Sequence, residues 1–519
     1  MNIAKALIGR ASCVLAMVAL GSGPGAWAQA GPAAPVSVKF ATLHSFNYTD
    51  GGSPESTLVQ ATNGDLYGTT WGGGANGFGT VFKITPGGKL TTLYNFCSQS
   101  DCSDGAGPTA GLVQATNGDL YGTTSAGGVT NPSCPYGSCG TIFQITPSGT
   151  LTTIHTFCSQ SGCPDGQTPL GGLVQAANGD LYGTTTEGGV STIAMYGGGT
   201  VFKITLGGTL TTVYNFCSES ACSDGDYPTA GPVQGTDGNL YGITELGGPH
   251  GGGTIYKITP SGTVTTMYSF CSQSACADGQ SPFPGLIQAA NGDLYGTTYY
   301  GGANVNTNVP YGGGTVFKIT PSAEFTTVYN FCAQSGCADG DLPQAGLRRA
   351  SDGNLYGMTA YGGSNTNPTV PYGGGTIFSI SPTDALTTLY SFCAQSGCAD
   401  GFSPIAGLVQ DTFGGFYGTT LGGGAGGNNR GTVFALSTGA PPFVETRPTI
   451  GAVGEVVTIV GYGLNGATSV SFNGIPATIL YDAPAVIYAK VPAGATTGKV
   501  QVVTPSGTLT SNVAFEVAP

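Results

Sequence analysis

One sequence block occurs seven times along the chain, and this repetition constrains the fold more than any other feature. Each copy is a version of GLVQATNGDLYGTT, followed by a glycine-rich stretch, GTVFKITPSG and LTTLYNF. The tyrosines of the YG motif mark the copies and follow one another at intervals of 54 to 61 residues: Tyr67, Tyr121, Tyr182, Tyr241, Tyr295, Tyr356 and Tyr417. A period of this size predicts a domain built from stacked structural repeats.

Each block predicts four short β-strands: LVQA, DLYGTT, TVFKIT and LTTLYNF. Asn-Gly or Asp-Gly separates the first two strands in six blocks, and Phe413-Gly414-Gly415 takes that place in the seventh. Such pairs are typical of two-residue hairpins, and Pro-Ser-Gly or Pro-Gly-Gly marks a second tight turn in most blocks. The 91 glycines and the charged fraction of only 8% fit many short strands joined by turns. Four antiparallel strands per unit predict an all-β propeller.

The two ends of the repeat region complement each other. Residues 40–46 read as a lone fourth-type strand, whereas the last block, from residue 407 to about 438, supplies only the first three strands. If residues 40–46 pair with the strand at 431–436, they supply the missing fourth strand of the last block. The ring then closes and leaves no unprotected sheet edge. The sequence therefore predicts seven blades with strand-exchange ring closure.

The N-terminal segment has the features of a signal peptide. Lys5 and Arg10 precede an apolar run, and Ala26-Trp27-Ala28 forms a small-x-small cleavage site, with cleavage after residue 30 as a second choice. Removing residues 1–28 leaves 12 basic residues against 27 acidic ones. Because no basic cluster remains to neutralise phosphates, neither nucleic acid nor an anionic lipid surface is an expected partner. Membrane insertion is not expected either, because no later stretch is long and apolar enough to span a membrane. We expect a secreted or cell-surface protein, with the periplasm as an alternative.

The cysteines agree with export. Beyond Cys13 of the leader, all fourteen fall in Cys-x4-Cys pairs: Cys97/Cys102, Cys134/Cys139, Cys158/Cys163, Cys217/Cys222, Cys271/Cys276, Cys332/Cys337 and Cys393/Cys398. Isolated pairs in a chain with three histidines make weak metal sites, so we predict seven local disulfides, no metal and no cofactor. Each disulfide would close a loop of about six residues, worth about 2 kcal/mol on the chain-entropy model.

The repeat GLVQATNGDLYGTT…GG…GTVFKIT resembles the GloVer tandem repeat of exported bacterial proteins, over residues 38–438. The resemblance implies a repeat-built exported protein and supplies no established activity. After a linker at 439–442, the stretches VTIVGYGLNGATSVSFNGIPA, VPAGATTGKVQVVTPSG and SNVAFEV resemble an IPT/TIG domain over residues 443–519. That resemblance implies an immunoglobulin-like β-sandwich with a spacer or adhesion role.

Strand alternation places the loops unequally. The two tight turns of every block lie at one end of the blade, which we call the short-turn end. The long Cys-x4-Cys loops and the glycine-rich loops lie at the other, which we call the long-loop end, where binding is normally found on a rigid scaffold. The loop between each fourth-type strand and the next block carries an Asp-Gly pair. We interpret its aspartate as forming an Asx-turn, with calcium ligation as a less favoured alternative. His44 and His155 occupy the tyrosine position of the fourth strand and are interpreted as packing variants.

Candidate ligand-binding residues are those that break the repeat at the long-loop end, directly after YGTT. They comprise four aromatic residues and two carboxylates: Trp71, Glu187, Glu245, Tyr299, Tyr300 and Tyr361. Four long loops add a tyrosine before glycine: Tyr136, Tyr196, Tyr311 and Tyr372. Aromatic faces with a few carboxylates suit sugar rings.

These features predict a non-catalytic binding or adhesion protein that recognises an extracellular polysaccharide or cell-surface glycan. A glycoside hydrolase or polysaccharide lyase is the first alternative, because Glu187 and Glu245 fall in adjacent blades and could form an acid/base pair. A structural component of the cell surface is the second.

Overall fold

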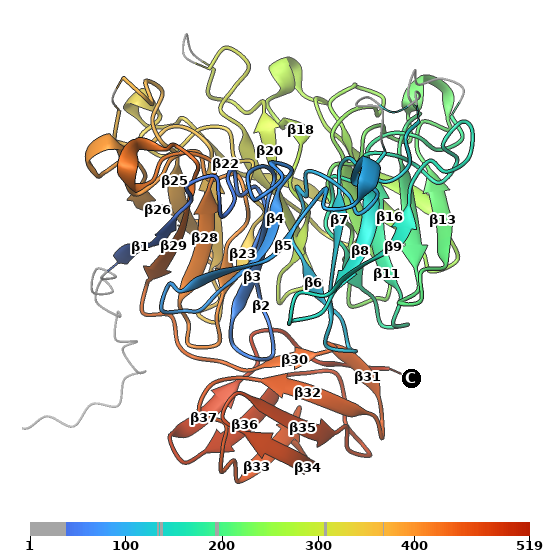
Figure 1. Ribbon diagram of the computed structural model, residues 1–519, viewed down its shortest axis with the longest axis vertical. Coiled ribbons are helices and arrows are strands. Elements are labelled where there is room, and N and C mark those ends of the chain that lie inside the picture. Colours follow the sequence, from blue (N-terminus) through green and yellow to red (C-terminus); the bar gives the residue numbers. More distant parts are fainter. Residues whose placement is uncertain are drawn as a thin grey trace, which may run out of the picture. The chain divides into compact units, whose positions relative to one another are not determined.

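The computed structural model describes residues 38–131, 134, 139–191, 197–305, 309–366 and 368–518. The expected signal peptide, Tyr136 and Tyr196 lie outside these residues. The described part of the chain belongs to one compact unit and contains a seven-bladed β-propeller followed by a β-sandwich (Figure 1). No helix within it is long and apolar enough to cross a membrane.

Each blade is a four-stranded antiparallel sheet, and blade 5 carries an extra short strand, β18 (Gln280–Pro282), beside β20. The first strands of blades 1 to 7 are β2 (Val59–Gln60), β6 (Val113–Gln114), β10 (Val174–Gln175), β14 (Val233–Gln234), β19 (Ile287–Gln288), β23 (Arg348–Arg349) and β27 (Val409–Gln410). The second strands are β3 (Leu66–Thr70), β7 (Leu120–Thr124), β11 (Leu181–Thr185), β15 (Leu240–Thr244), β20 (Leu294–Tyr300), β24 (Leu355–Thr359) and β28 (Phe416–Thr420).

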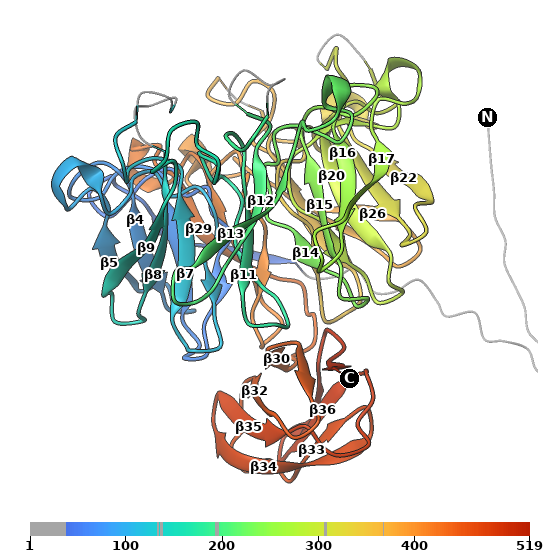
Figure 2. The same cartoon turned by 90° about the vertical axis from the view of Figure 1, so that its right-hand side faces the viewer.

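The third strands are β4 (Thr80–Ile84), β8 (Thr141–Ile145), β12 (Thr200–Ile204), β16 (Thr254–Ile258), β21 (Thr315–Ile319), β25 (Thr376–Ile380) and β29 (Thr432–Ser437). The fourth strands of blades 1 to 6 are β5 (Leu90–Asn95), β9 (Leu151–Thr156), β13 (Leu210–Asn215), β17 (Val264–Ser269), β22 (Phe325–Asn330) and β26 (Leu386–Ser391). Figure 2 shows the blades side by side around the ring.

The ring closes between its two ends, as predicted. β1 (Lys39–Ser45) pairs antiparallel with β29, from Lys39 opposite Ser437 to Ser45 opposite Thr432, and so becomes the fourth strand of blade 7. This arrangement confirms the seven blades and the strand exchange. No residue of the C-terminal domain takes part in that pairing.

Adjacent blades pack through aromatic side chains that recur with the repeat. In blade 1, Tyr67, Val81 and Phe96 are buried against the second and third strands of blade 2. Phe96 meets Phe143 edge-on at a centroid distance of 5.2 Å. The glycine of YGTT is required by this packing, since a Cβ at Gly68 would lie 2.8 Å from the Phe82 ring. The residues repeated in every block therefore serve mainly to pack one blade against the next.

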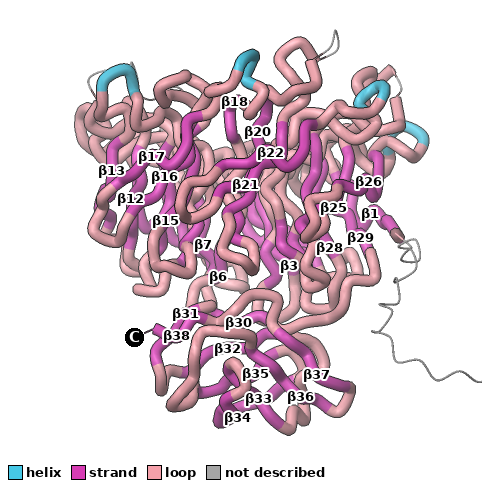
Figure 3. Tube along the Cα trace, turned by 180° about the vertical axis from the view of Figure 1, so that it is seen from behind, coloured by secondary structure: helices cyan, strands magenta, loops and turns pink. Residues whose placement is uncertain are grey.

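Short 3-10 helices occur in the loops at the long-loop end: η1 (Ser100–Cys102), η2 (Ser220–Cys222), η3 (Ser274–Cys276), η4 (Ser335–Cys337), η5 (Ser396–Cys398) and η6 (Ala425–Gly427). Figure 3 shows them gathered at one end of the blades. The first five each contain the second cysteine of a Cys-x4-Cys pair, and every one of the seven pairs is joined as a disulfide.

The C-terminal domain has an immunoglobulin-like architecture with a core built around Phe472, Ile487 and Phe515. Its main sheet runs in the order β30-β32-β35-β34-β33-β36-β37, and β31 pairs in parallel with β38. The strands are β30 (Glu445–Arg447), β31 (Ile450–Ala452), β32 (Val456–Val460), β33 (Ser469–Phe472), β34 (Ile475–Ala483), β35 (Val486–Lys490), β36 (Val500–Thr504), β37 (Gly507–Thr510) and β38 (Glu516–Ala518).

Contacts of β30 tie this domain to the short-turn end of the propeller. Arg447 donates from Nη2 to the Gln60 carbonyl at 2.6 Å and from Nη1 to Gln114 Oε1 at 3.0 Å. Glu445 lies between Arg447 (2.9 Å) and Arg348 (3.7 Å). The long-loop end makes no such contact among the residues described.

Candidate ligand-binding site

The repeat-breaking positions at the long-loop end come in pairs. In every blade, the residue after the Asp-Gly pair that precedes the first strand forms an antiparallel bridge with the second residue after YGTT. The bridges are Gly52–Gly72, Ala106–Ala126, Gln167–Glu187, Asp226–Leu246, Gln280–Tyr300, Asp341–Tyr361 and Phe402–Gly422. Divergence after YGTT points only to the second member of each pair. The first member diverges between blades in the same way, at the position after Asp-Gly.

The aspartate of each Asp-Gly holds its own loop in place, and in six blades that loop also carries a disulfide. In blade 6, Asp339 accepts hydrogen bonds from the Tyr329 hydroxyl (2.8 Å) and from the backbone amides of Ala333 (2.9 Å) and Gln334 (3.1 Å). These donors lie upstream of the aspartate, so the side chain closes the whole loop and does more than form a local Asx-turn. His44 and His155 replace the tyrosine in this role, bonding to Asp50 (2.8 Å) and Asp165 (3.0 Å).

A cavity of about 540 Å³ opens between blades 5 and 6 at this end. We call it the tyrosine pocket, because its lining includes Tyr299 of β20 and, from the glycine-rich loop after β24, Tyr361 and Tyr372. Tyr361 and Tyr372 are 38% and 67% exposed, so their rings are accessible from solvent. Asp341 and Leu342 contribute the inner part of the wall. Aromatic walls around a polar group are the usual composition of a small-ligand site.

Asp341 is the unusual group in the tyrosine pocket. The residue is only 8% exposed, and its Oδ1 atom has no hydrogen-bond partner in the structure. Burial raises the pKa of the Asp341 carboxyl to about 7, and the nearby charge of Asp339 adds to the shift although the Leu342 amide opposes it. An unpaired buried carboxylate carries a free-energy cost, and such groups mark functional sites more often than chance predicts.

A second set of aromatic contacts fixes Tyr299. Its ring meets Tyr300 edge-on at 4.4 Å, and Tyr300 in turn meets Tyr311 at 6.0 Å. Burial raises the pKa of the Tyr299 hydroxyl, with further contributions from Tyr300, Tyr361 and Asp341. Tyr299 is therefore neutral at physiological pH, and it can donate a hydrogen bond to a bound molecule.

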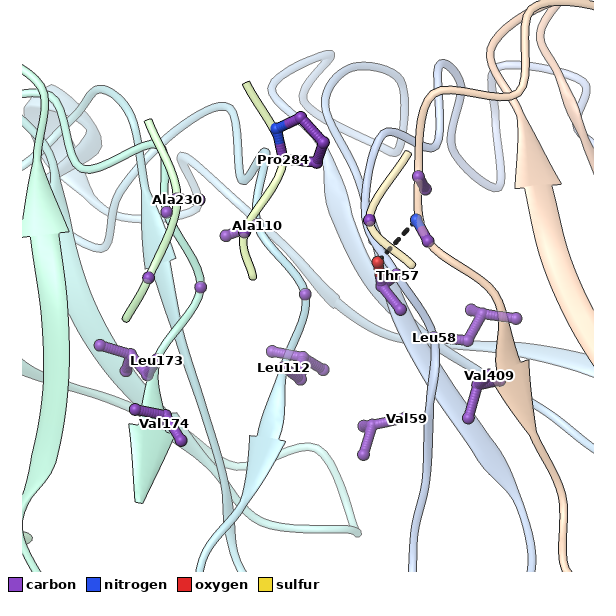
Figure 4. Close-up of a pocket in the computed structure, with 18 of the residues that line it drawn as sticks. Thr57, Leu58, Val59, Ala110, Leu112, Leu173, Val174, Ala230, Pro284 and Val409 are labelled. Carbon is purple, nitrogen blue, oxygen red and sulfur yellow. Dashed lines mark hydrogen bonds between the residues drawn. The ribbon is translucent and has the colours of Figure 1, made fainter. Parts of the chain in front are cut away.

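The central channel of the ring forms another cavity, of about 410 Å³. Figure 4 shows leucine and valine side chains from the first strands of neighbouring blades and the hydrogen bond from the Gly407 amide to Thr57 Oγ1 at 2.8 Å. Most of this lining repeats from blade to blade, and Glu445 and Arg447 of the C-terminal domain reach it. Glu55 lies at a position that Thr109, Leu170 and Phe283 hold in other blades, and burial raises its pKa to about 7. Among the described residues that line the channel, Glu55 is the one carboxyl with a raised pKa, and no cluster of aromatic rings surrounds it. We therefore favour the tyrosine pocket as the ligand-binding site.

The candidate residues named from the sequence are distributed over five blades. Tyr299 and Tyr361 line the tyrosine pocket together, and Tyr300 packs against Tyr299. Trp71 lies in blade 1, where it is 52% exposed.

Glu187 and Glu245 belong to blades 3 and 4. Glu187 accepts a hydrogen bond from Gln167 Nε2 at 3.0 Å. Burial raises its pKa, and the acidic neighbour that adds to this shift is Asp226. Burial alone raises the pKa of Glu245. The structure thus brings Tyr299 and Tyr361 together in the tyrosine pocket. Among the described interactions, none joins Glu187 to Glu245.

Comparison with known proteins places the fold in context. A fungal alcohol oxidase of the AA5 family, solved in complex with copper, aligns at 12% identity and a TM-score of 0.48, covering 93% of this chain and 99% of that one. A luciferin-regenerating enzyme aligns at 13% identity and a TM-score of 0.36, covering 63% and 89%. Similarities at this level transfer no activity. Among curated proteins, no sequence matches significantly.

The family comparison is specific. Residues 32–228 and 191–434 match the profile of the Gloeobacter/Verrucomicrobia repeat, and residues 444–517 match the IPT/TIG domain. These matches agree with both resemblances inferred from the sequence. The chain belongs to the Gloeobacter/Verrucomicrobia repeat family and carries an IPT/TIG domain after its propeller.

Proposed function

We propose that this protein is exported and binds a glycan through the tyrosine pocket, without catalysing a reaction on it. The observation that carries the proposal is the convergence of Tyr299, Tyr361, Tyr372 and the unpaired Asp341 on one solvent-accessible cavity. Tyrosine rings offer flat apolar surfaces to the C–H faces of a sugar, and a carboxylate oxygen accepts hydrogen bonds from its hydroxyls.

The long-loop end suits binding because it is already ordered before a ligand arrives. The disulfide between Cys332 and Cys337 and the hydrogen bonds of Asp339 fix the loop that carries Asp341. A preformed site avoids the entropic cost of ordering loops on binding. The seven disulfides also support export, since such bonds persist mainly in oxidising compartments.

The test is a panel of soluble polysaccharides and oligosaccharides, assayed together for binding and for release of reducing ends. We expect binding without release. Tyr361→Ala should weaken binding, whereas Tyr481→Ala, which removes a 51% exposed ring from the C-terminal domain, should not. If no glycan binds the folded protein, or if Tyr361→Ala binds as well as the wild type, the proposal is wrong.

The enzyme alternative rests on the glutamates of blades 3 and 4, because burial raises the pKa values of Glu187 and Glu245. A raised pKa suits a general acid. If the panel does release reducing ends, Glu187→Gln and Glu245→Gln identify the source, since loss of a general acid lowers turnover about a hundredfold or more.

A further inference from the structure

We propose that the tyrosine pocket is selective for a cationic group, and that its ligand is an amino sugar with a free ammonium, as in a deacetylated aminoglycan. This inference rests on the proposed function and deepens it by naming the feature of the glycan that is recognised. It is carried by the unpartnered Oδ1 of Asp341 and by the three tyrosine rings that share its cavity.

The walls of the pocket are complementary to a cation. The π face of a tyrosine ring attracts an ammonium placed over it, and the attraction grows as water is excluded. Tyr299, Tyr361 and Tyr372 supply three such rings. Tyr361 lies opposite Asp341 in an antiparallel bridge, and paired residues in such a bridge project to the same side of the strands. An ammonium held by Tyr361 would therefore lie beside the carboxylate.

The charges around Asp341 have one sign. Among the described residues that line the pocket, none is lysine, arginine or histidine. The other titratable groups that face Asp341 are Asp339 and the hydroxyls of Tyr299 and Tyr361. Asp339 is fully buried, and both of its carboxylate oxygens accept hydrogen bonds within the protein. It therefore adds negative potential without competing for a ligand. A neutral sugar hydroxyl beside the carboxyl would leave this potential uncompensated, whereas an ammonium offsets it.

Blade 4 provides a natural control for this arrangement. Asp226 occupies the position equivalent to Asp341, but its bridge partner is Leu246 in place of a tyrosine. Burial raises the pKa of Asp226 as well. The two sites therefore share the acidic group and differ in the aromatic walls, so Asp226→Asn changes the same charge on the same face of the protein without touching the pocket.

The experiment compares three oligosaccharides of equal length by isothermal titration calorimetry: a fully N-acetylated chitooligosaccharide, its fully deacetylated form, and the N,N,N-trimethylated form, whose charge does not depend on pH. Measurements are made at moderate salt between pH 5 and pH 8. We expect the deacetylated form to bind at least tenfold more tightly than the acetylated form near pH 6.5. The affinity for the trimethylated form should rise at least tenfold from pH 5 to pH 8, because Asp341 becomes ionised over this interval.

Asp341→Asn should abolish both the preference and the pH dependence while retaining binding of the acetylated form, and Asp226→Asn should retain both. Equal or tighter binding of the acetylated form, or an Asp341→Asn protein that keeps the preference, overturns the cation assignment and leaves the proposed function standing. Equal losses in the two variants would indicate a general attraction to the acidic surface and also overturn it. If none of the three oligosaccharides binds the folded wild type, the cation assignment fails, whereas the proposed function fails only if the wider glycan panel is also negative.

Discussion

Two carboxylates at opposite ends of the propeller, one half-buried and one buried, have contrasting environments. Glu445, where the C-terminal domain meets the short-turn end, lies between two guanidinium groups; burial alone would raise its pKa, but Arg447 and Arg348 more than offset this and lower it. Asp341, at the long-loop end, has no basic partner in its pocket, and burial raises its pKa to about 7. A carboxylate whose charge is compensated by arginines, such as Glu445, holds two domains together. A carboxylate without a compensating cation, such as Asp341, is available to a cationic ligand.

The largest effect is expected from removing the uncompensated charge. Asp341→Asn should stabilise the unliganded protein at pH 8 by roughly 2–4 kcal/mol, because the folded state no longer ionises a group whose pKa is far above its unfolded value of 3.8. The penalty in the wild type grows as the pH rises from about 4 to 7 and is constant above that, so wild type and variant should coincide near pH 4.

Thermal unfolding at pH 4, 6 and 8 measures this difference. Asp226→Asn is the matched control and should show a smaller gain, since Asp226 is less buried than Asp341. A variant that is no more stable than wild type at pH 8 would mean that Asp341 has a compensating partner.

At the short-turn end, removal of the carboxylate charge is expected to lower the stability of the protein. Glu445→Gln keeps the shape of the side chain but leaves Arg348 and Arg447 facing each other without a counter-charge. We expect a loss of about 1–3 kcal/mol, given that the three groups retain some exposure to solvent. Differential scanning calorimetry measures it, with Glu324→Gln in an exposed turn as the control. An unchanged melting temperature would remove the contrast between the two carboxylates.

Binding should depend on the aromatic wall more modestly. Tyr361→Ala should weaken glycan affinity by about 1–2 kcal/mol, or roughly tenfold, which is typical for loss of an aromatic anchor in a small site. Tyr300→Ala should have a smaller effect, because Tyr300 supports Tyr299 and lies outside the pocket lining. If the two variants lose affinity in the reverse order, the site is centred on Tyr300 and Tyr311 instead.

The smallest effect is expected in blade 1. Trp71 is the only tryptophan of the chain beyond the expected signal peptide, so its fluorescence reports on that blade alone. A glycan bound between blades 5 and 6 should leave its emission maximum unchanged, and Trp71→Phe should retain full affinity. A clear shift on ligand addition would extend the binding surface to blade 1.

The sequence by itself determined the scaffold. Each block of the repeat makes its contacts mainly with its own strands and with the next block, so the periodic placement of Tyr, Gly and Phe specifies one blade and its neighbour independently of the rest of the chain. The orphan strand at 40–46 and the incomplete last block then fix the number of blades and the closure, because unpaired backbone groups at a sheet edge must be satisfied. The end of the blade that carries the long loops also follows from strand alternation.

Only the tertiary structure decided which of the divergent residues meet. Trp71, Glu187, Glu245 and the tyrosines break the repeat equally in the sequence, yet only the interface between blades 5 and 6 brings Tyr299 beside Tyr361 and Tyr372. The pairing of Asp341 with Tyr361 depends on a backbone bridge between two loops. The ion pair of Arg348 with Glu445 depends on a contact between the propeller and the C-terminal domain. Local periodicity carries no information on those contacts, because they are made by the side chains in which the repeats differ.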